Sequence, residues 1–113
     1  MSNIANIALT ALQALEKKSE VIADNIANVN TDRFKKSRAN LEEGSPSGVK
    51  VSMEQVNTSI ETVTAEAAEP VPSNVDLAEE LIDLIVTRSS YTANTKTVKA
   101  ADQMQGFLFD ILG

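Results

Sequence analysis

Small and apolar residues recur near the N-terminus at alternating spacings of three and four residues. The series runs through Ala5, Ala8, Leu12, Leu15, Ser19, Ile22, Ile26 and Val29. This spacing puts every member on one face of an α-helix and is the heptad repeat of helices that pack lengthwise. A second row of mostly small residues runs beside it, through Ile7, Ala11, Ala14, Lys18 and Val21. The spacing predicts a helix from Ile4 to Val29 with an apolar face wider than one partner helix needs.

A second long helix is predicted near the C-terminus. Pro70 and Pro72 end whatever precedes it, and Asp76 with Glu79 resembles a capping box at a helix start. Residues 73–113 contain no proline that would interrupt the helix. Its apolar face begins at Leu77, Ala78, Leu81, Ile82, Leu84 and Ile85. The seam continues more weakly through Arg88, Tyr91, Thr95, Val98, Asp102, Gln105, Phe109 and Leu112, with Ala101 and Leu108 alongside.

The lengths of these helices constrain the architecture. They would measure about 39 Å and 55 Å at about 1.5 Å per residue, whereas a compact domain of this size has a radius of gyration of about 13 Å. The rest of the chain therefore cannot enclose them. We expect an antiparallel coiled coil that buries one seam of each helix, leaves the second rows exposed and finishes folding in an assembly. The predicted helix-packing residues are Ala8, Leu12, Leu15, Ile22, Ile26, Val29, Leu77, Leu81, Leu84, Ile85, Val98, Leu108 and Leu112.

The middle of the chain is short and polar. Val49, Val51 and Met53 alternate with polar residues, as in a short strand, and residues 60–64 give a candidate second strand. Thr64 to Pro72 has the composition of a linker. We expect a mainly α fold with a small β-hairpin that leans on a helix. The predicted divisions are an N-terminal helix and its motif over 1–33, a variable middle over 34–72 and a C-terminal helix over 73–113.

The amino-acid composition argues against most kinds of catalytic and metal site. The 113 residues include no cysteine and no histidine, and the net charge is −6. The commonest metal ligand, the commonest general base and thiolate chemistry are absent, and an acidic chain is poorly suited to binding nucleic acid. We therefore predict no catalytic residues, no metal site, no cofactor and no enzyme activity.

Neither a membrane span nor a secretory signal is predicted. No apolar run approaches the roughly 20 residues that span a bilayer. Residues 1–15 lack the basic start, apolar stretch and cleavage site of a signal peptide. An exported protein of this kind would leave the cytoplasm by another route.

Charged clusters have ordinary explanations. One basic cluster surrounds Phe34 and consists of Arg33, Lys35, Lys36 and Arg38. The favoured interpretation is a solvated loop. A contact for an acidic partner comes second and a nucleic-acid site last. The acidic residues after Asp76 are explained by capping and by the helix dipole.

Two segments carry a more specific signal. The first runs from Ile22 to Lys35, with the sequence IADNIANVNTDRFK, and follows Ala8–Gln13. The second opens with PSNVDLAEELIDLI at Pro72 and continues through RSSYTAN at Arg88 and KAADQM at Lys99. Together they resemble the N- and C-terminal signatures of the flagellar axial proteins, the rod, hook and hook-associated family. The signature residues are Asn25, Asn28, Asn30, Thr31, Phe34, Lys35, Asn74, Val75, Asp76, Leu77, Tyr91 and Asn94.

The resemblance implies a structural subunit of the bacterial flagellar basal-body rod, which assembles by helix packing into a tubular axial structure. Its implied partners are itself, other axial proteins and the flagellar type III export apparatus, and its implied location is the periplasmic rod. One departure concerns Arg33, which stands where family members commonly have glycine, so this turn must form without glycine's freedom at positive φ. The alternative is a cytoplasmic coiled-coil adaptor or flagellar export chaperone, which explains the seams equally well.

Overall fold

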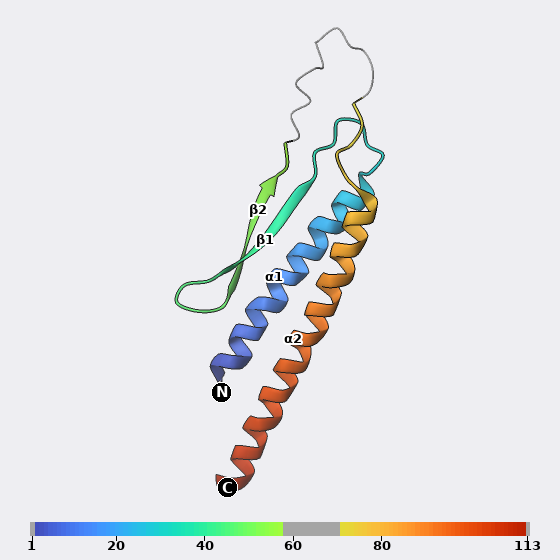
Figure 1. The fold of residues 1–113 in the computed structure, drawn as a ribbon. Helices are drawn as coiled ribbons and strands as arrows, with labels where there is room; N and C mark the ends of the chain where they lie inside the picture. The colour runs from blue at the N-terminus through green and yellow to red at the C-terminus, as the bar shows by residue number, and fades with distance from the viewer. Residues whose placement is uncertain (1, 58–70, 113) are drawn as a thin grey trace.

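The computed structural model describes residues 2–57 and 71–112, which form two helices and one hairpin (Figure 1). Helix α1 spans Ser2–Ala27, strand β1 Ser37–Glu43, strand β2 Val49–Gln55 and helix α2 Leu77–Leu112. α1 and α2 pack side by side in opposite directions, and the hairpin lies along α1. The expected fold class, mainly α with a small hairpin in the middle, is confirmed.

The molecule is long and thin. Its principal extents are 76 × 26 × 13 Å and its radius of gyration is 19.9 Å. A compact chain of this length would have a radius of gyration of about 13 Å. The prediction that the rest of the chain cannot enclose these helices is therefore confirmed.

The hairpin pairs β2 with a segment that the sequence did not predict as a strand. The strand predicted around Val49–Met53 is β2, but its partner is β1, upstream, with Leu41 opposite Val51 and Ala39 opposite Met53. The candidate strand at residues 60–64 lies outside the described residues. Ala39 is buried, and β1 and β2 both contact α1, so the inner face of the hairpin packs on this helix.

The hairpin also changes what α1 exposes. Ala14 and Val21, from the second row of α1, are buried together with Ala8, Leu15 and Ile22 from its heptad seam. The expectation that this second row would remain exposed is wrong for Ala14 and Val21, because α1 lies between α2 and the hairpin, whereas Ile7 is exposed. The wide apolar face of α1 is thus shared between these two partners.

Two polar contacts hold the hairpin in register along α1. At one end the Val49 N–H donates to Thr10 Oγ1 at 3.0 Å, and at the other the Ser37 N–H donates to Asn25 Oδ1 at 3.1 Å. Thr10 and Asn25 lie about 22 Å apart along a helix at about 1.5 Å per residue. Strand β1 runs from Ser37 to Glu43, and Glu43 pairs with Val49. At about 3.4 Å per residue this strand covers about 20 Å. The two lengths match, so the hairpin reaches from one contact to the other.

Gly48 makes the first of these contacts geometrically possible. Its φ is +94°, and a Cβ added there would lie 2.9 Å from Thr10 Oγ1. Only glycine combines this backbone conformation with so close an approach to α1.

We predict that Gly48→Ala lowers the free energy of unfolding by about 1–2 kcal/mol, because alanine is strained at positive φ. Urea unfolding followed by circular dichroism measures the change. The matched control is Gly106→Ala, where an added Cβ meets nothing within 4 Å and where alanine in a helix favours folding by about 0.5–1 kcal/mol. A Gly48→Ala protein as stable as the parent would contradict the proposed contact between the hairpin turn and Thr10.

Candidate functional site

Asn25, in the last turns of α1, connects three elements. Its side chain is 1% exposed. The amide Nδ2 donates to the Ser37 carbonyl at 2.8 Å and to Glu80 Oε1 at 3.3 Å, while Oδ1 accepts from the Ser37 N–H at 3.1 Å. One asparagine therefore joins the end of α1 to the start of β1 and to the first turn of α2. An asparagine suits this position because its side chain both donates and accepts.

The turn after α1 is held by its own side chains. The Thr31 hydroxyl donates to Asn28 Oδ1 at 3.0 Å, and Asn28 Nδ2 donates to the Asp24 carbonyl at 2.9 Å. Arg33 has a φ of 64°, in the left-handed region. The position where the resembled family has glycine thus does require a glycine-like backbone conformation, and here an arginine adopts it.

Asn74 makes the equivalent connection just before α2. Its Oδ1 accepts from the Lys36 N–H at 2.7 Å, and its Nδ2 donates to the Val56 carbonyl at 2.9 Å. The Asn74 N–H donates to the Phe34 carbonyl at 3.3 Å. We call the cluster of Asn25, Lys36, Ser37, Asn74 and Glu80 the asparagine junction, and the end of the molecule that holds it the junction end.

The start of α2 is capped by Asp76. Its Oδ1 accepts from the N–H groups of Ala78 at 3.0 Å and Glu79 at 3.3 Å. The Glu79 carboxylate is directed elsewhere, to Lys36 Nζ at 3.8 Å and to the Arg38 guanidinium at 3.9 Å. The Asp76 half of the predicted capping box is therefore present, whereas the Glu79 carboxylate instead links α2 to the segment that enters β1.

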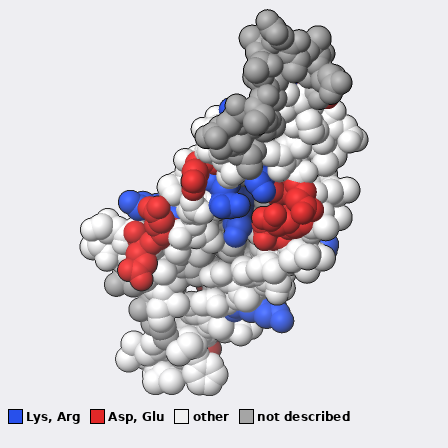
Figure 2. All heavy atoms as spheres, turned by 45° about the horizontal axis from the view of Figure 1, so that its top comes forward, with Lys and Arg blue, Asp and Glu red and all other residues white. Residues whose placement is uncertain are grey.

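Glu80 is the one acid of this group that is buried, with 5% of its surface exposed. Burial raises the pKa of the Glu80 carboxyl above its ordinary value, with a smaller upward effect from Asp83 and Glu79. The hydrogen bond from Asn25 and the charge of Lys36 act in the opposite direction. A cavity of about 30 Å³ beside it is lined by side chains of both signs, including Lys18 and Asp83. Figure 2 shows basic and acidic side chains gathered next to one another, whereas the lower end of this face is mostly uncharged.

The other signature residues lie apart from the junction or at its edge. Val75 is buried and Phe34 is half-buried. Asn30, Lys35 and Tyr91 are exposed, and Asn94 is half-buried, with its Nδ2 donating to the Ser90 carbonyl at 2.9 Å. The structure thus brings Asn25 and Asn74 into one cluster from opposite ends of the chain, and it leaves Tyr91 and Asn94 farther along α2.

The row of α2 that faces α1 differs in part from the predicted seam, of which Val98 and Gln105 are half-buried. The members of the facing row are Glu80, Thr87 and Ala101, which are buried, and Asn94, which is half-buried. They recur every seven residues, but they are small or polar and therefore carry little hydrophobic signal. Arg88, Thr95 and Asp102, from the predicted seam, are exposed. The Thr87 hydroxyl is buried without a hydrogen-bond partner among the described residues. The small size of threonine suits this position to close helix contact.

The predicted helix-packing residues fall into three groups. Ala8, Leu15 and Ile22 are buried in the single chain. Leu12, Ile26, Val29, Leu84 and Val98 are half-buried. Leu77, Leu81, Ile85, Leu108 and Leu112 are exposed. The first two groups include all the packing positions predicted for the N-terminal helix, of which Val29 lies just after α1, and the exposed group lies entirely on α2.

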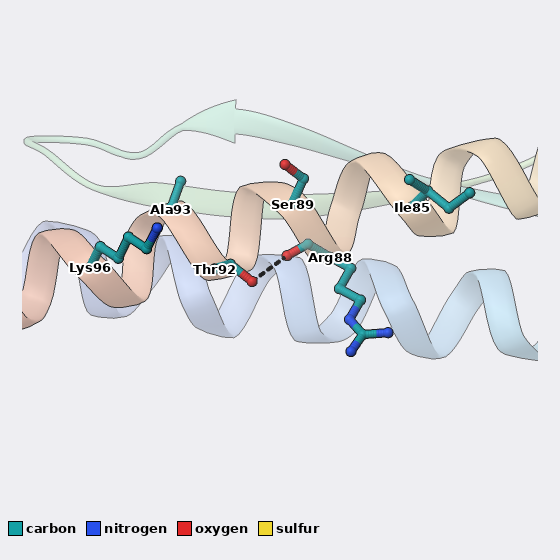
Figure 3. Close-up of a pocket in the computed structure, with 6 residues that line it drawn as sticks. All are labelled: Ile85, Arg88, Ser89, Thr92, Ala93 and Lys96. Carbon is teal, nitrogen blue, oxygen red and sulfur yellow. Dashed lines mark hydrogen bonds between the residues drawn. The ribbon is translucent and has the colours of Figure 1, made fainter.

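The outer side of α2 offers only a shallow depression. It is lined by Ile85, Arg88, Ser89, Thr92, Ala93 and Lys96, all from this one helix (Figure 3). The Thr92 hydroxyl donates to the Arg88 carbonyl at 3.0 Å and is not directed outward as a nucleophile. Among residues 2–57 and 71–112, no acidic cluster has a metal-binding arrangement and no helix is long and apolar enough to cross a bilayer.

Comparisons with known families match both ends of the chain. The model described as "Flagella basal body rod protein" matches residues 6–35, and the model described as "Flagellar basal body rod FlgEFG protein C-terminal" matches residues 73–111. Together they cover more than half of the chain, in the order that the signatures predict. A comparison with curated proteins gives no match. The first matched segment contains Asn25 and the second contains Asn74 and Glu80, so the asparagine junction is formed where the two matched segments meet.

We predict that Asn25→Ala lowers the free energy of unfolding by about 2–4 kcal/mol, because it leaves both Ser37 backbone groups and Glu80 without this partner. Denaturant unfolding of the purified chain measures the loss. The control is Asn30→Ala in the same turn, where the side chain is exposed and the expected change is within about 0.5 kcal/mol. Equal stability of the two variants would show that the junction does not hold the helices together.

The pH dependence of stability tests Glu80. Because the pKa of this carboxyl is raised in the folded chain, the folded state holds the proton more tightly, and the contribution of Glu80 to stability falls as pH rises through that pKa. Glu80→Gln keeps an acceptor for Asn25 and cannot ionise. We expect this variant to be more stable than the parent at pH 7, with the difference disappearing below the ordinary glutamate pKa.

Unfolding curves between pH 4 and pH 8, with Glu43→Gln as an exposed control, measure the Glu80 effect. The control should show no comparable difference from the parent over this range. A Glu80→Gln protein that is less stable than the parent at pH 7 would mean that the attraction of the carboxylate to Lys36 outweighs the cost of burying its charge.

Proposed function

We propose that this chain, which belongs to the flagellar basal body rod family, is a structural subunit that assembles into the tubular axial rod. The matches to two rod-family models support a location at the flagellar basal body and other flagellar axial proteins as partners. Its role there is structural and not catalytic.

One observation carries the proposal. The two segments that the rod models match are held together in a single elongated unit by Asn25 and Asn74. α2, by contrast, exposes large apolar side chains near both of its ends, such as Ile85 near its start and Phe107 and Leu112 near its end. A soluble monomer rarely exposes so much apolar surface, and an apolar helix face of this kind marks a surface that contacts other proteins.

The proposed mode of assembly is helix packing between neighbouring subunits in a coiled-coil layer. Most of the stability of a helix in water comes from the packing of its apolar face. The faces that remain open on α2 would be covered by neighbours in the axial structure. We further propose that the subunit reaches the periplasmic rod through the flagellar type III export apparatus without a cleaved signal peptide.

Fractionation of the bacterium that encodes the chain tests the proposal. A rod subunit remains with purified basal bodies after detergent extraction, at a fixed ratio to the other rod proteins. Asn25→Ala, which breaks the junction, should reduce its amount in basal bodies at least several-fold, whereas Asn30→Ala should not. A chain recovered only from the cytoplasm, bound to another flagellar protein, would instead identify an adaptor or export chaperone.

A further inference from the structure

The cavity beside Glu80 lies where α1, the start of β1 and the first turns of α2 meet. Its volume is about 30 Å³. A buried water molecule needs about 10–15 Å³ of such space and two to four polar partners. Sites for organic ligands are far larger, at about 300 Å³ or more. The cavity therefore has the size of a water site and is too small for an organic ligand.

The charges around the cavity are balanced. Three basic and three acidic side chains line it, namely Lys18, Lys36, Arg38, Glu79, Glu80 and Asp83. An anion placed there would be repelled by the acidic side chains and a cation by the basic ones, and partial burial strengthens both repulsions. A neutral molecule meets neither cost. The lining therefore favours a neutral occupant that can both accept and donate hydrogen bonds.

Lys36 brings a hydrogen-bond donor to this cavity. The residue is 9% exposed, and its Nζ lies 3.8 Å from Glu79 Oε2, which is too far for a direct hydrogen bond. Nζ donates no hydrogen bond to any residue in the described part of the chain. An ammonium group has three N–H donors, and burying it without an acceptor is costly. A water molecule beside Nζ supplies that acceptor.

Glu80 brings an acceptor to the same cavity. Its Oε1 accepts from Asn25 Nδ2 at 3.3 Å, whereas its Oε2 accepts from no other described residue. Lys36 and Glu80 form no direct ion pair within residues 2–57 and 71–112, yet the charge of Lys36 acts to lower the pKa of the Glu80 carboxyl. The two groups are thus close enough to interact but do not touch. One bridging water spans a separation of this kind.

We propose that this cavity holds one ordered water molecule, which accepts a hydrogen bond from Lys36 Nζ and donates one to each of the carboxyl groups of Glu79 and Glu80. Three hydrogen bonds are the usual number for a buried water. The water joins the segment that enters β1 to the first turn of α2, beside the direct links that Asn25 and Asn74 make. The proposal concerns the single chain and goes beyond the rod assignment, which its failure would leave unaffected.

A crystal structure of the full chain, at a resolution that shows ordered water, tests the proposal. The expected result is a density peak about 2.7–3.2 Å from Lys36 Nζ and from a carboxyl oxygen of both Glu79 and Glu80. A direct hydrogen bond from Lys36 to either carboxylate that closes the cavity would overturn the proposal, as would a cavity without a peak. Crystals soaked in sodium bromide separate water from an anion, and anomalous scattering from bromide at the site would also overturn it.

Lys36→Met tests the donor. Methionine has a similar length and donates no hydrogen bond, so the peak should disappear from crystals of this variant. The matched control is Lys35→Met, where the side chain is exposed and the peak should remain. A peak of unchanged height in the Lys36→Met protein would show that Lys36 does not hold the water.

Filling the cavity tests the site in solution. Ala39 is buried on β1 and lines the cavity, so the larger side chain of Ala39→Val should displace the water and leave Lys36 and Glu80 without it. The equilibrium constant for unfolding should then rise about ten-fold or more, as expected for buried polar groups that lose a partner.

The same substitution in the Lys36→Met background separates loss of the water from steric strain. There the water has already lost its donor, so Ala39→Val should raise the unfolding constant by less than about three-fold, which makes the two substitutions non-additive. Strain alone would have the same effect in both backgrounds. Equal effects, or an Ala39→Val protein that is more stable than the parent, would overturn the proposal.

Discussion

The hydrogen bonds made by the buried side chain of Asn25 are the interaction on which the rest of the fold depends. Its buried amide donates to the Ser37 carbonyl and to Glu80 and accepts from the Ser37 N–H. The loop after α1 has to return to this point, and it does so through a turn that requires Arg33 at positive φ. Once Ser37 is fixed, β1 starts beside α1 and α2 starts beside both. An exposed hydrogen bond would contribute little, but here each group left unpaired would be buried and would cost about 1–3 kcal/mol.

Regular spacing made the helices predictable, whereas the buried polar contacts were not. The heptad series gave α1, and the prolines with Asp76 gave the start of α2 to within one residue. β1 was missed because its inner face offers only Ala39 and Leu41, while its outer face is charged. This segment is a strand because Asn25 and Asn74 hold Ser37 and Lys36 at its start and because β2 pairs with it. Those contacts cross long sequence separations, which periodicity cannot detect.

The sequence predicted which residues belong to the site, but it did not predict how they are arranged in space. Asn25 and Asn74 were identified from the resemblance to the axial proteins, yet nothing in the spacing indicated that they meet in one cluster. Glu80 was assigned to the helix dipole, although it recurs at seven-residue intervals with Thr87, Asn94 and Ala101. This row was overlooked because helix contact was predicted from hydrophobicity. Close packing of two helices accepts small and hydrogen-bonded polar residues. Most of the larger apolar residues of α2 remain exposed, whereas Leu84 and Val98 are half-buried.

The large exposed apolar residues of α2 are unevenly distributed along the helix. An exposed stripe along all of α2 would allow contact in any register. Here the middle of the helix is polar and basic, through Arg88, Lys96 and Lys99, and the apolar surface is restricted to the two ends. Burial at the ends supplies attraction that depends little on direction.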